Sequence, residues 1–331
     1  MRRYLGEALP ERARIAVIAN DALGNYVVST PLLQMLRAKY PSGKLDYYSG
    51  TRVRELWQHD TNVDQGFPLF GGPPYDSIKA QPNPYDLVIN IEQLPWAKCF
   101  AAAISGPEAF VCGPSLGLDG RDDLPFPDDE RGQLARDREW IASDLTKKYP
   151  FLQSGFIGEI FCRLAYLEGP VPPYKVPSTE PEGEVPDVLI ATAASLPEKL
   201  WPVAKWIESL EAIRKKGQTV GLIGAKPKEQ KQFWQGGSGE EELVASCLVE
   251  DLRGKYKLTE VVGALAKAKQ VLTLDNGILH MAVSTGTPTV GLYRHGIHRL
   301  WAPPYKNLTV LTPGEGKPVE DITVDQVLDA L

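Results

Sequence analysis

The chain has 331 residues, of which 43% are hydrophobic and 24% are charged, and its formal net charge is −6. This length exceeds one typical hydrophobic core and predicts two domains of an ordinary soluble globular protein. A negative net charge without a basic stripe argues against nucleic acid as a partner.

The N-terminus carries positive charges but lacks an apolar segment of signal-peptide length, and no later run is long enough to span a membrane. We therefore expect a cytoplasmic protein. The four cysteines show no CxxC spacing, which favours small buried thiols over a disulfide framework or a zinc site. They are Cys99, Cys112, Cys162 and Cys247.

The first half of the chain alternates apolar runs with helical patterns. Residues 14–19, RIAVIA, are typical of a parallel strand buried on both faces. A turn at 20–25 contains Asp21, Gly24 and Asn25, and a helix over 26–40 is expected to hold Pro31 in its first turn. Further expected elements are strands at 44–49 and 85–91, helices at 53–58, 96–104, 131–148 and 156–167, and loops at 66–84 and 113–129.

Residues 169–186 form the strongest composition shift in the chain, with six prolines and no helical periodicity. Such a segment indicates a domain boundary. We therefore expect a first domain over 1–170, a linker over 171–186, a second domain over 187–317 and a C-terminal helix within 318–331.

The second half repeats the alternation of strands and helices. Strands are expected at 187–191, 219–223, 247–250, from 272 and at 289–293; helices at 202–215, 227–234, 258–267, 278–286 and 324–331; and a loop at 235–242. This order predicts an α/β fold of two doubly wound parallel sheets separated by a cleft, with ligands at the carboxyl ends of the strands.

Residues 272–288 combine a buried strand, a polar turn and a helix. The turn holds Asp275, Asn276 and Gly277, and the helix opens at about Ile278, so free amides and the positive end of the helix dipole would favour a phosphate there. Lys199 could add a cation and Ser195 a hydroxyl donor. The ordinary alternatives are a capping role for Asp275, a solvated loop position for Lys199, and a packed or capping role for His280.

Other fingerprints of nucleotide and metal sites are missing from the sequence. No GxGxxG follows a predicted strand, and no GxxxxGK[ST] occurs. His295 and His298 have a spacing seen in metal sites, but no carboxylate or cysteine accompanies them, so we expect no metal.

Several segments in order resemble the heptosyltransferase family, glycosyltransferase family nine. They are IANDALGNYVVSTPLLQMLRAKYP, YDLVINIEQ, SLPEKLWPVAKW, LRGKYKLTEVVGALAKAK and LDNGILHMAVSTGTPTVGLY, followed by RLWAPP. The resemblance runs through nearly the whole chain. It implies the GT-B fold, two Rossmann-like domains, with the acceptor on the first domain and the donor on the second.

The resemblance also implies roles for single residues. Asp275 and His280 would contact the donor, Lys199 and Ser195 its phosphate, and the backbone near Leu252 its nucleobase. Gly24, Asn276, Gly277 and Ile278 complete the expected donor-binding set. The donor would be a nucleotide sugar, typically ADP-heptose, used without metal or other cofactor, and the acceptor a bacterial glycan or glycolipid such as lipopolysaccharide core, with peripheral contact at the inner membrane face. The sequence predicts no oligomeric state.

Asn25 departs from this family. The first turn there usually ends in Gly-Asp, whose aspartate is the expected general base, whereas this chain has Gly24 and Asn25, and an amide cannot accept the proton. Asp21 could serve instead, or be an ordinary turn residue. Two alternatives to a transferase follow: a catalytically weak or silent nucleotide-sugar-binding protein, and a sugar-nucleotide epimerase of the same architecture.

Overall fold

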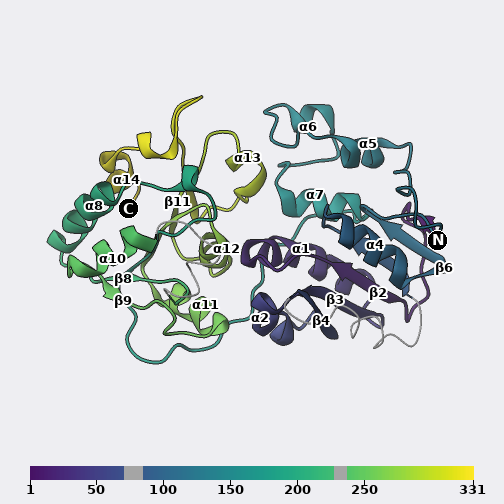
Figure 1. Cartoon of the computed structure of the whole chain (residues 1–331), viewed down its shortest axis with the longest axis horizontal. Coiled ribbons are helices and arrows are strands. Elements are labelled where there is room, and N and C mark those ends of the chain that lie inside the picture. Colours follow the sequence, from purple (N-terminus) through teal and green to yellow (C-terminus); the bar gives the residue numbers. More distant parts are fainter. Residues whose placement is uncertain (71–84, 227–236) are drawn as a thin grey trace. The chain divides into compact units, whose positions relative to one another are not determined.

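The computed structural model describes residues 1–70, 85–226 and 237–331 of a chain that divides into two units, Met1–Tyr174 and Lys175–Leu331 (Figure 1). Each unit contains a six-stranded sheet, in the orders β1-β6-β5-β2-β3-β4 and β12-β11-β10-β7-β8-β9. The paired named strands in the described residues are all parallel. The predicted α/β class with two parallel sheets is therefore confirmed.

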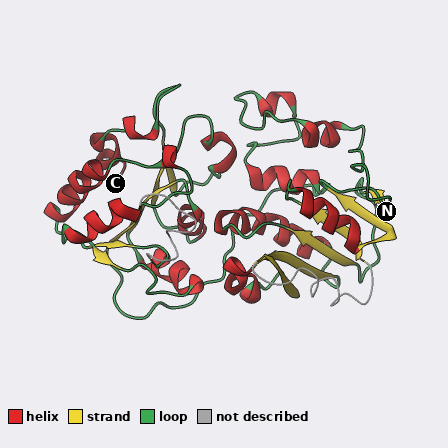
Figure 2. Cartoon of the chain, viewed as in Figure 1, coloured by secondary structure: helices red, strands yellow, loops and turns green. Residues whose placement is uncertain are grey.

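Strands and helices alternate in the first unit (Figure 2), and the three strands predicted there correspond to β2, β3 and β5. The strands are β1 (Arg2–Arg3), β2 (Arg14–Ile18), β3 (Lys44–Gly50), β4 (Gln65–Phe70), β5 (Tyr85–Asn90) and β6 (Ser105–Cys112). The helices are α1 (Leu23–Lys39), the 3-10 turn η1 (Thr51–Val53), α2 (Arg54–His59), α4 (Pro95–Ile104), α5 (Glu130–Arg136), α6 (Leu145–Lys148) and α7 (Ile157–Leu164).

Residues that alternate along β2 face different helical layers. Ala16 and Ile18 pack with Phe100 and Ile104 of α4, so Ile15 and Val17 face the opposite side of the sheet. The crossover from β2 through α1 to β3 advances in one direction across the sheet, and the crossover from β5 through α4 to β6 in the other. Right-handed crossovers then place α1 and α4 on opposite faces and bring the β2 and β5 carboxyl ends together at the centre.

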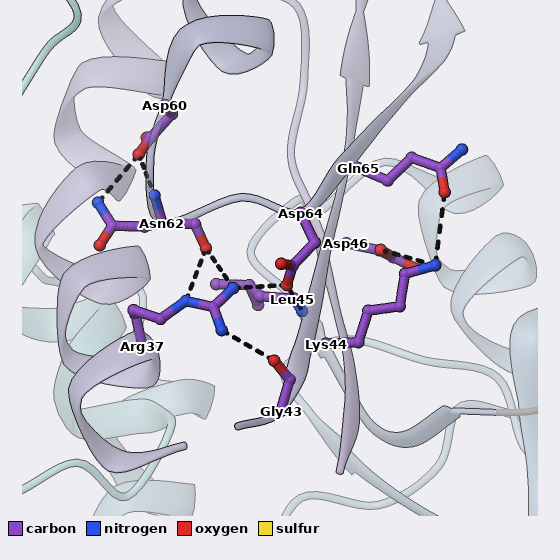
Figure 3. Close-up of polar contacts among 9 residues, drawn as sticks. All are labelled: Arg37, Gly43, Lys44, Leu45, Asp46, Asp60, Asn62, Asp64 and Gln65. Atoms are coloured by element: carbon purple, nitrogen blue, oxygen red, sulfur yellow. Dashed lines mark hydrogen bonds and ion pairs between the residues drawn. The ribbon is translucent and has the colours of Figure 1, made fainter. Parts of the chain in front are cut away.

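Side chains at the opposite, amino edge of this sheet serve a structural purpose. Near the end of α1, Arg37 donates to the carbonyls of Gly43 (2.8 Å) and Asn62 (2.9 Å) and pairs with Asp64 (2.5 Å) (Figure 3). Asp64 also accepts from the Leu45 amide. One guanidinium thereby ties α1 to the segments that lead into β3 and β4.

The second unit repeats the plan. Its strands are β7 (Val188–Ala191), β8 (Val220–Leu222), β9 (Glu250–Asp251), β10 (Gln270–Leu274), β11 (Thr289–Leu292) and β12 (Leu308–Leu311). Its helices are η2 (Pro197–Lys199), α8 (Val203–Lys215), α10 (Gly237–Ala245), α11 (Leu258–Lys267), α12 (Gly277–Ser284), α13 (His298–Trp301), η3 (Val319–Asp321) and α14 (Val324–Ala330). Helices α8, α10 and α14 share one core with the sheet, which contains Trp206, Leu243 and Val327.

The proline-rich segment lies against the second unit. Thr179 donates its amide to the Thr259 carbonyl (3.0 Å), and the two hydroxyls are 2.9 Å apart. A Cβ on Gly263 of α11 would lie 1.9 Å from the Thr179 carbonyl oxygen, so only glycine permits this approach. Residues of the expected linker are thus bound along α11.

Several sequence predictions about the first unit are wrong. Helix α1 begins at Leu23, so Gly24 and Asn25 belong to its first turn and Pro31 to its interior. The loop expected from residue 66 begins with β4, an edge strand where Pro68 is tolerated. The single helix expected over 131–148 is two short helices, because the chain turns away after Arg136, where Asp137 binds Lys148 and Tyr149.

Other corrections concern short elements and thiols. Strands β1, β6 and β12 were missed. Helix α10 occupies part of the expected loop at 235–242, and β9 overlaps the expected strand at 247–250 only at Glu250. The expected helix at 227–234 lies outside the described residues. The cysteines are free, but Cys99 and Cys247 are exposed instead of buried.

Candidate functional site

The turn between β10 and α12 is built by Asn276, the N-cap of α12. Its Oδ1 accepts from the Leu279 amide (3.2 Å), and its Nδ2 donates to the Ala193 carbonyl (3.0 Å) beyond β7. The side chain thus joins two neighbouring turns at the carboxyl edge of the sheet. The amides of Gly277 and Ile278, in the first turn, have no intrahelical acceptor and remain suited to an anion, whereas the Leu279 amide is used by the cap.

Lys199 and Asp275 form an ion pair beside this helix terminus. Lys199 Nζ lies 2.7 Å from Asp275 Oδ2 and donates to the Asp275 carbonyl at 3.2 Å. The side chains are 16% and 6% exposed, respectively. The lysine predicted to bind phosphate is therefore brought to the predicted place, where its charge is matched by a carboxylate. Ser195 lies at the exposed start of the same turn.

His280 lies one turn into α12 and is almost completely buried. Burial lowers the pKa of His280 to about 4, Asp275 opposes that effect, and Lys199 adds to it. The imidazole is thus neutral at pH 7. Its ring centroid is 6.2 Å from that of Trp301 in α13.

The sequence did not single out Tyr293 and Arg253, which the structure places beside two of the predicted site residues, Asp275 and Leu252. Tyr293 directly follows β11, and burial, followed by the charge of Asp275, raises its pKa well above the usual range. Arg253 directly follows Leu252 and pairs with Glu240 (3.3 Å) and Asp251 (2.8 Å), while Thr192 donates to Glu240 (2.9 Å). Position at the end of a strand was the signal that could have identified both.

Leu252, expected near a nucleobase, is 1% exposed. Its amide donates to the Leu222 carbonyl (2.9 Å) and its carbonyl accepts from Lys255 (3.1 Å). The amide is therefore unavailable to a ligand, and the carbonyl keeps one lone pair for a donor such as an exocyclic amine.

The first unit presents a polar group at the carboxyl ends of β2 and β3. The Asp21 side chain is 31% exposed, and its Oδ1 lies 3.8 Å from Arg52 Nη1. A Cβ on Gly50 would fall 1.8 Å from the Asp21 Cβ, so glycine at the end of β3 makes room for the aspartate. Gly24 and Asn25 follow in the first turn of α1. The Asp21 carboxylate is therefore available at this end of the sheet, although Asn25, at the expected position of the base, is an amide.

His295 and His298 lie close together after β11, with ring centroids 6.0 Å apart, and burial lowers the pKa of His298. Within residues 1–70, 85–226 and 237–331, no group of three or more His, Cys, Asp or Glu side chains could hold a metal ion. In the same residues no helix has both the length and the apolar character needed to cross a bilayer.

Residues 174–322 match the model of glycosyltransferase family 9 (heptosyltransferase). The chain is 22% identical to the lipopolysaccharide core heptosyltransferase OpsX of Haemophilus influenzae over 89% of this chain and 82% of that protein. It is also 30% identical to lipooligosaccharide heptosyltransferase 2 of the same organism, over 34% of this chain and only 32% of the relative.

Solved structures show the same fold over nearly full length. A glycosyl transferase family 9 structure from Veillonella parvula has a TM-score of 0.73 and 16% identity, covering 98% of this chain and 97% of that one. E. coli ADP-heptose LPS heptosyltransferase II has a TM-score of 0.67 and 20% identity, covering 96% and 97%. The two Rossmann-like units therefore define the GT-B fold class. The match to glycosyltransferase family 9 (heptosyltransferase) itself is confined to residues 174–322, which include most of the second unit.

Proposed function

We propose that the protein is an inverting, metal-independent glycosyltransferase that moves a heptose from ADP-heptose to a bacterial surface glycan such as lipopolysaccharide core. The observation that carries the proposal is the placement of Lys199 and Asp275 at the N-terminus of α12, beside the Gly277 and Ile278 amides. An ammonium and first-turn amides suit a diphosphate leaving group. The relatives named above support heptose as the sugar.

The proposed reaction is a single displacement. An acceptor hydroxyl attacks the anomeric carbon from the face opposite the nucleotide, the bond from that carbon to the phosphate oxygen breaks, and ADP leaves with the electron pair. Lys199 and the α12 amides stabilise the growing negative charge on the phosphate. Asp21 accepts the hydroxyl proton, and positioned bases of this kind contribute roughly 100- to 10,000-fold.

Within the donor site we assign contacts by chemistry. Ser195, Gly277 and Ile278 face the diphosphate, Asp275 and neutral His280 face the sugar hydroxyls, and the Leu252 carbonyl faces the nucleobase. Asn276 acts by holding the turn, since its side chain is occupied by Ala193 and Leu279. The proposed location is the cytoplasm, with peripheral contact at the inner membrane face through a glycolipid acceptor.

The test is transfer itself. Purified protein is incubated with ADP-heptose and heptose-deficient lipopolysaccharide core, with and without EDTA, and ADP release and acceptor mass are followed. Equal transfer in both conditions is expected, with inversion at the anomeric carbon. Asp21→Asn should abolish transfer and leave ADP affinity unchanged; retained transfer would exclude Asp21 as the base.

Asn25 favours one second candidate, a binding protein that retains the donor site but does not catalyse. It predicts ADP-heptose binding without ADP release. Asn25→Asp separates the two: a marked rise in turnover, from a second carboxylate beside Asp21, supports a transferase, and no change together with an inactive native protein supports the binding protein.

A further inference from the structure

Two turns of the first unit are joined by a hydrogen bond between side chains 72 residues apart. Asn20 follows β2, Glu92 follows the neighbouring strand β5, and Asn20 Nδ2 donates to Glu92 Oε2 at 2.7 Å. Both residues lie at the carboxyl edge of the sheet, where Asp21 is also found. The pair therefore belongs to the same edge as the proposed base.

Asn20 holds the backbone on either side of Asp21. Its Oδ1 accepts from the Ala22 amide at 2.9 Å, which closes a turn around Asp21, and its carbonyl accepts from the buried Ser49 hydroxyl. The orientation of the Asn20 amide is thus set by two partners, Ala22 on its oxygen and Glu92 on its nitrogen. These bonds restrain the backbone next to Asp21.

Glu92 is itself anchored. Its Oε1 accepts the amides of Gln93 (2.7 Å) and Leu94 (3.2 Å) immediately before α4, which leaves Oε2 directed at Asn20. The carboxylate therefore connects the start of a helix to the turn that carries Asp21. Because Asn20 and Glu92 are 72 residues apart, the sequence alone does not show this contact.

We propose that Glu92 is a positioning residue for transfer, acting through Asn20 to hold Asp21 in the orientation that accepts the acceptor proton. This inference rests on the proposed function and adds a residue to it. Correct orientation is worth large factors in rate, and a misplacement of about 1 Å can cost roughly 100-fold. Glu92 does not itself take the proton.

The test exchanges the polarity of the hydrogen bond. In Glu92→Gln two side-chain amide NH2 groups face each other, and in Asn20→Asp two carboxylates face each other. Each single variant should therefore lower kcat by about 10- to 100-fold, with little change in the KM for donor. The double variant Asn20→Asp/Glu92→Gln restores one donor and one acceptor and keeps the bonds to Ala22, Gln93 and Leu94. Its kcat should return to within about threefold of the native value.

A matched control is available before β4, in a pair whose carboxylate also accepts from the Tyr26 hydroxyl of α1. Asn62 Nδ2 donates to Asp60 at 2.9 Å, an amide–carboxylate pair of the same chemistry (Figure 3). Asn62→Asp should lower Tm without lowering kcat. This comparison separates loss of stability from loss of positioning.

Three outcomes would overturn the inference. They are unchanged kcat in both single variants, a double variant that recovers its Tm but not its kcat, and an equal loss of kcat in Asn62→Asp. The second would mean that the Glu92 carboxylate is itself required. Failure of the proposed function is recognised separately, because the native protein would then release no ADP from any acceptor mixture.

Discussion

At the scale of single residues, the Lys199–Asp275 pair decides how donor-site substitutions must be interpreted. Both side chains are largely buried, so removal of one leaves an uncompensated charge as well as an altered ligand contact. A fall in affinity after one substitution therefore combines two effects. A double variant separates them.

Lys199→Ala and Asp275→Ala are each expected to weaken ADP-heptose binding and to lower the free energy of unfolding by about 3 kcal/mol. Lys199→Met/Asp275→Asn should regain most of the stability but not the affinity, because it lacks the cation that faces the diphosphate. Calorimetric titration and urea unfolding give the two quantities. Native affinity in the double variant would contradict the assignment of Lys199.

His280 makes stability depend on pH. Its pKa is lowered to about 4 in the fold from 6.5, so between these values the unfolded chain binds a proton that the folded chain does not. The contribution of neutral His280 to the free energy of unfolding is therefore complete above pH 6.5 and is lost as pH falls toward 4. The loss between pH 7 and pH 5 is about 2 kcal/mol. Denaturant unfolding of His280→Gln should show a shallower dependence; an identical slope would contradict this account.

At the scale of elements, α1 shows how a helix tolerates proline in its interior. Pro31 has no amide to offer the Val27 carbonyl four residues earlier, and the Thr30 hydroxyl donates to that carbonyl at 2.8 Å. The carbonyl thus keeps a partner inside the buried helix. The Thr30 hydroxyl takes the place of the amide that Pro31 lacks, so proline is tolerated in the interior of α1. The sequence predicted Pro31 in the first turn instead.

Thr30→Val is expected to lower stability by about 1 to 3 kcal/mol, since it leaves the Val27 carbonyl buried without that donor. In the Pro31→Ala background the same change should cost much less, because the alanine restores a backbone amide. Thr30→Ser, which keeps the hydroxyl, is the control. Thermal unfolding of these variants and the native protein measures the coupling, and additive effects would exclude it.

At the scale of the whole molecule, the second unit includes the segment that joins it to the first. Thr179 bonds to Thr259, and Gly263 admits the Thr179 backbone. The fragment 175–331 is therefore expected to unfold cooperatively and bind ADP, and a fragment from 187 to unfold at a lower temperature. Circular dichroism melts of both test this, and equal melting temperatures would contradict it.

The sequence predicted the sheets where strands are continuous apolar runs, as in β2, β5 and β10, because burial on both faces leaves a clear pattern. It missed β6, in which Gly106 and Pro107 interrupt the pattern, and β12, which is an edge strand. At the candidate site, the sequence indicated Lys199, Asp275 and His280 because each lies in or just after a turn that follows a predicted strand. It could not indicate Asn20 and Glu92, since their pairing depends on strand order.

The ion pair at α12 also has a consequence for the kinetics of association. A free lysine would attract a diphosphate over about one Debye length, roughly 8 Å at physiological ionic strength. Here the Asp275 carboxylate cancels that field until the ligand arrives. The rate of donor capture should therefore depend only weakly on ionic strength, and discrimination should reside in how long the nucleotide stays bound.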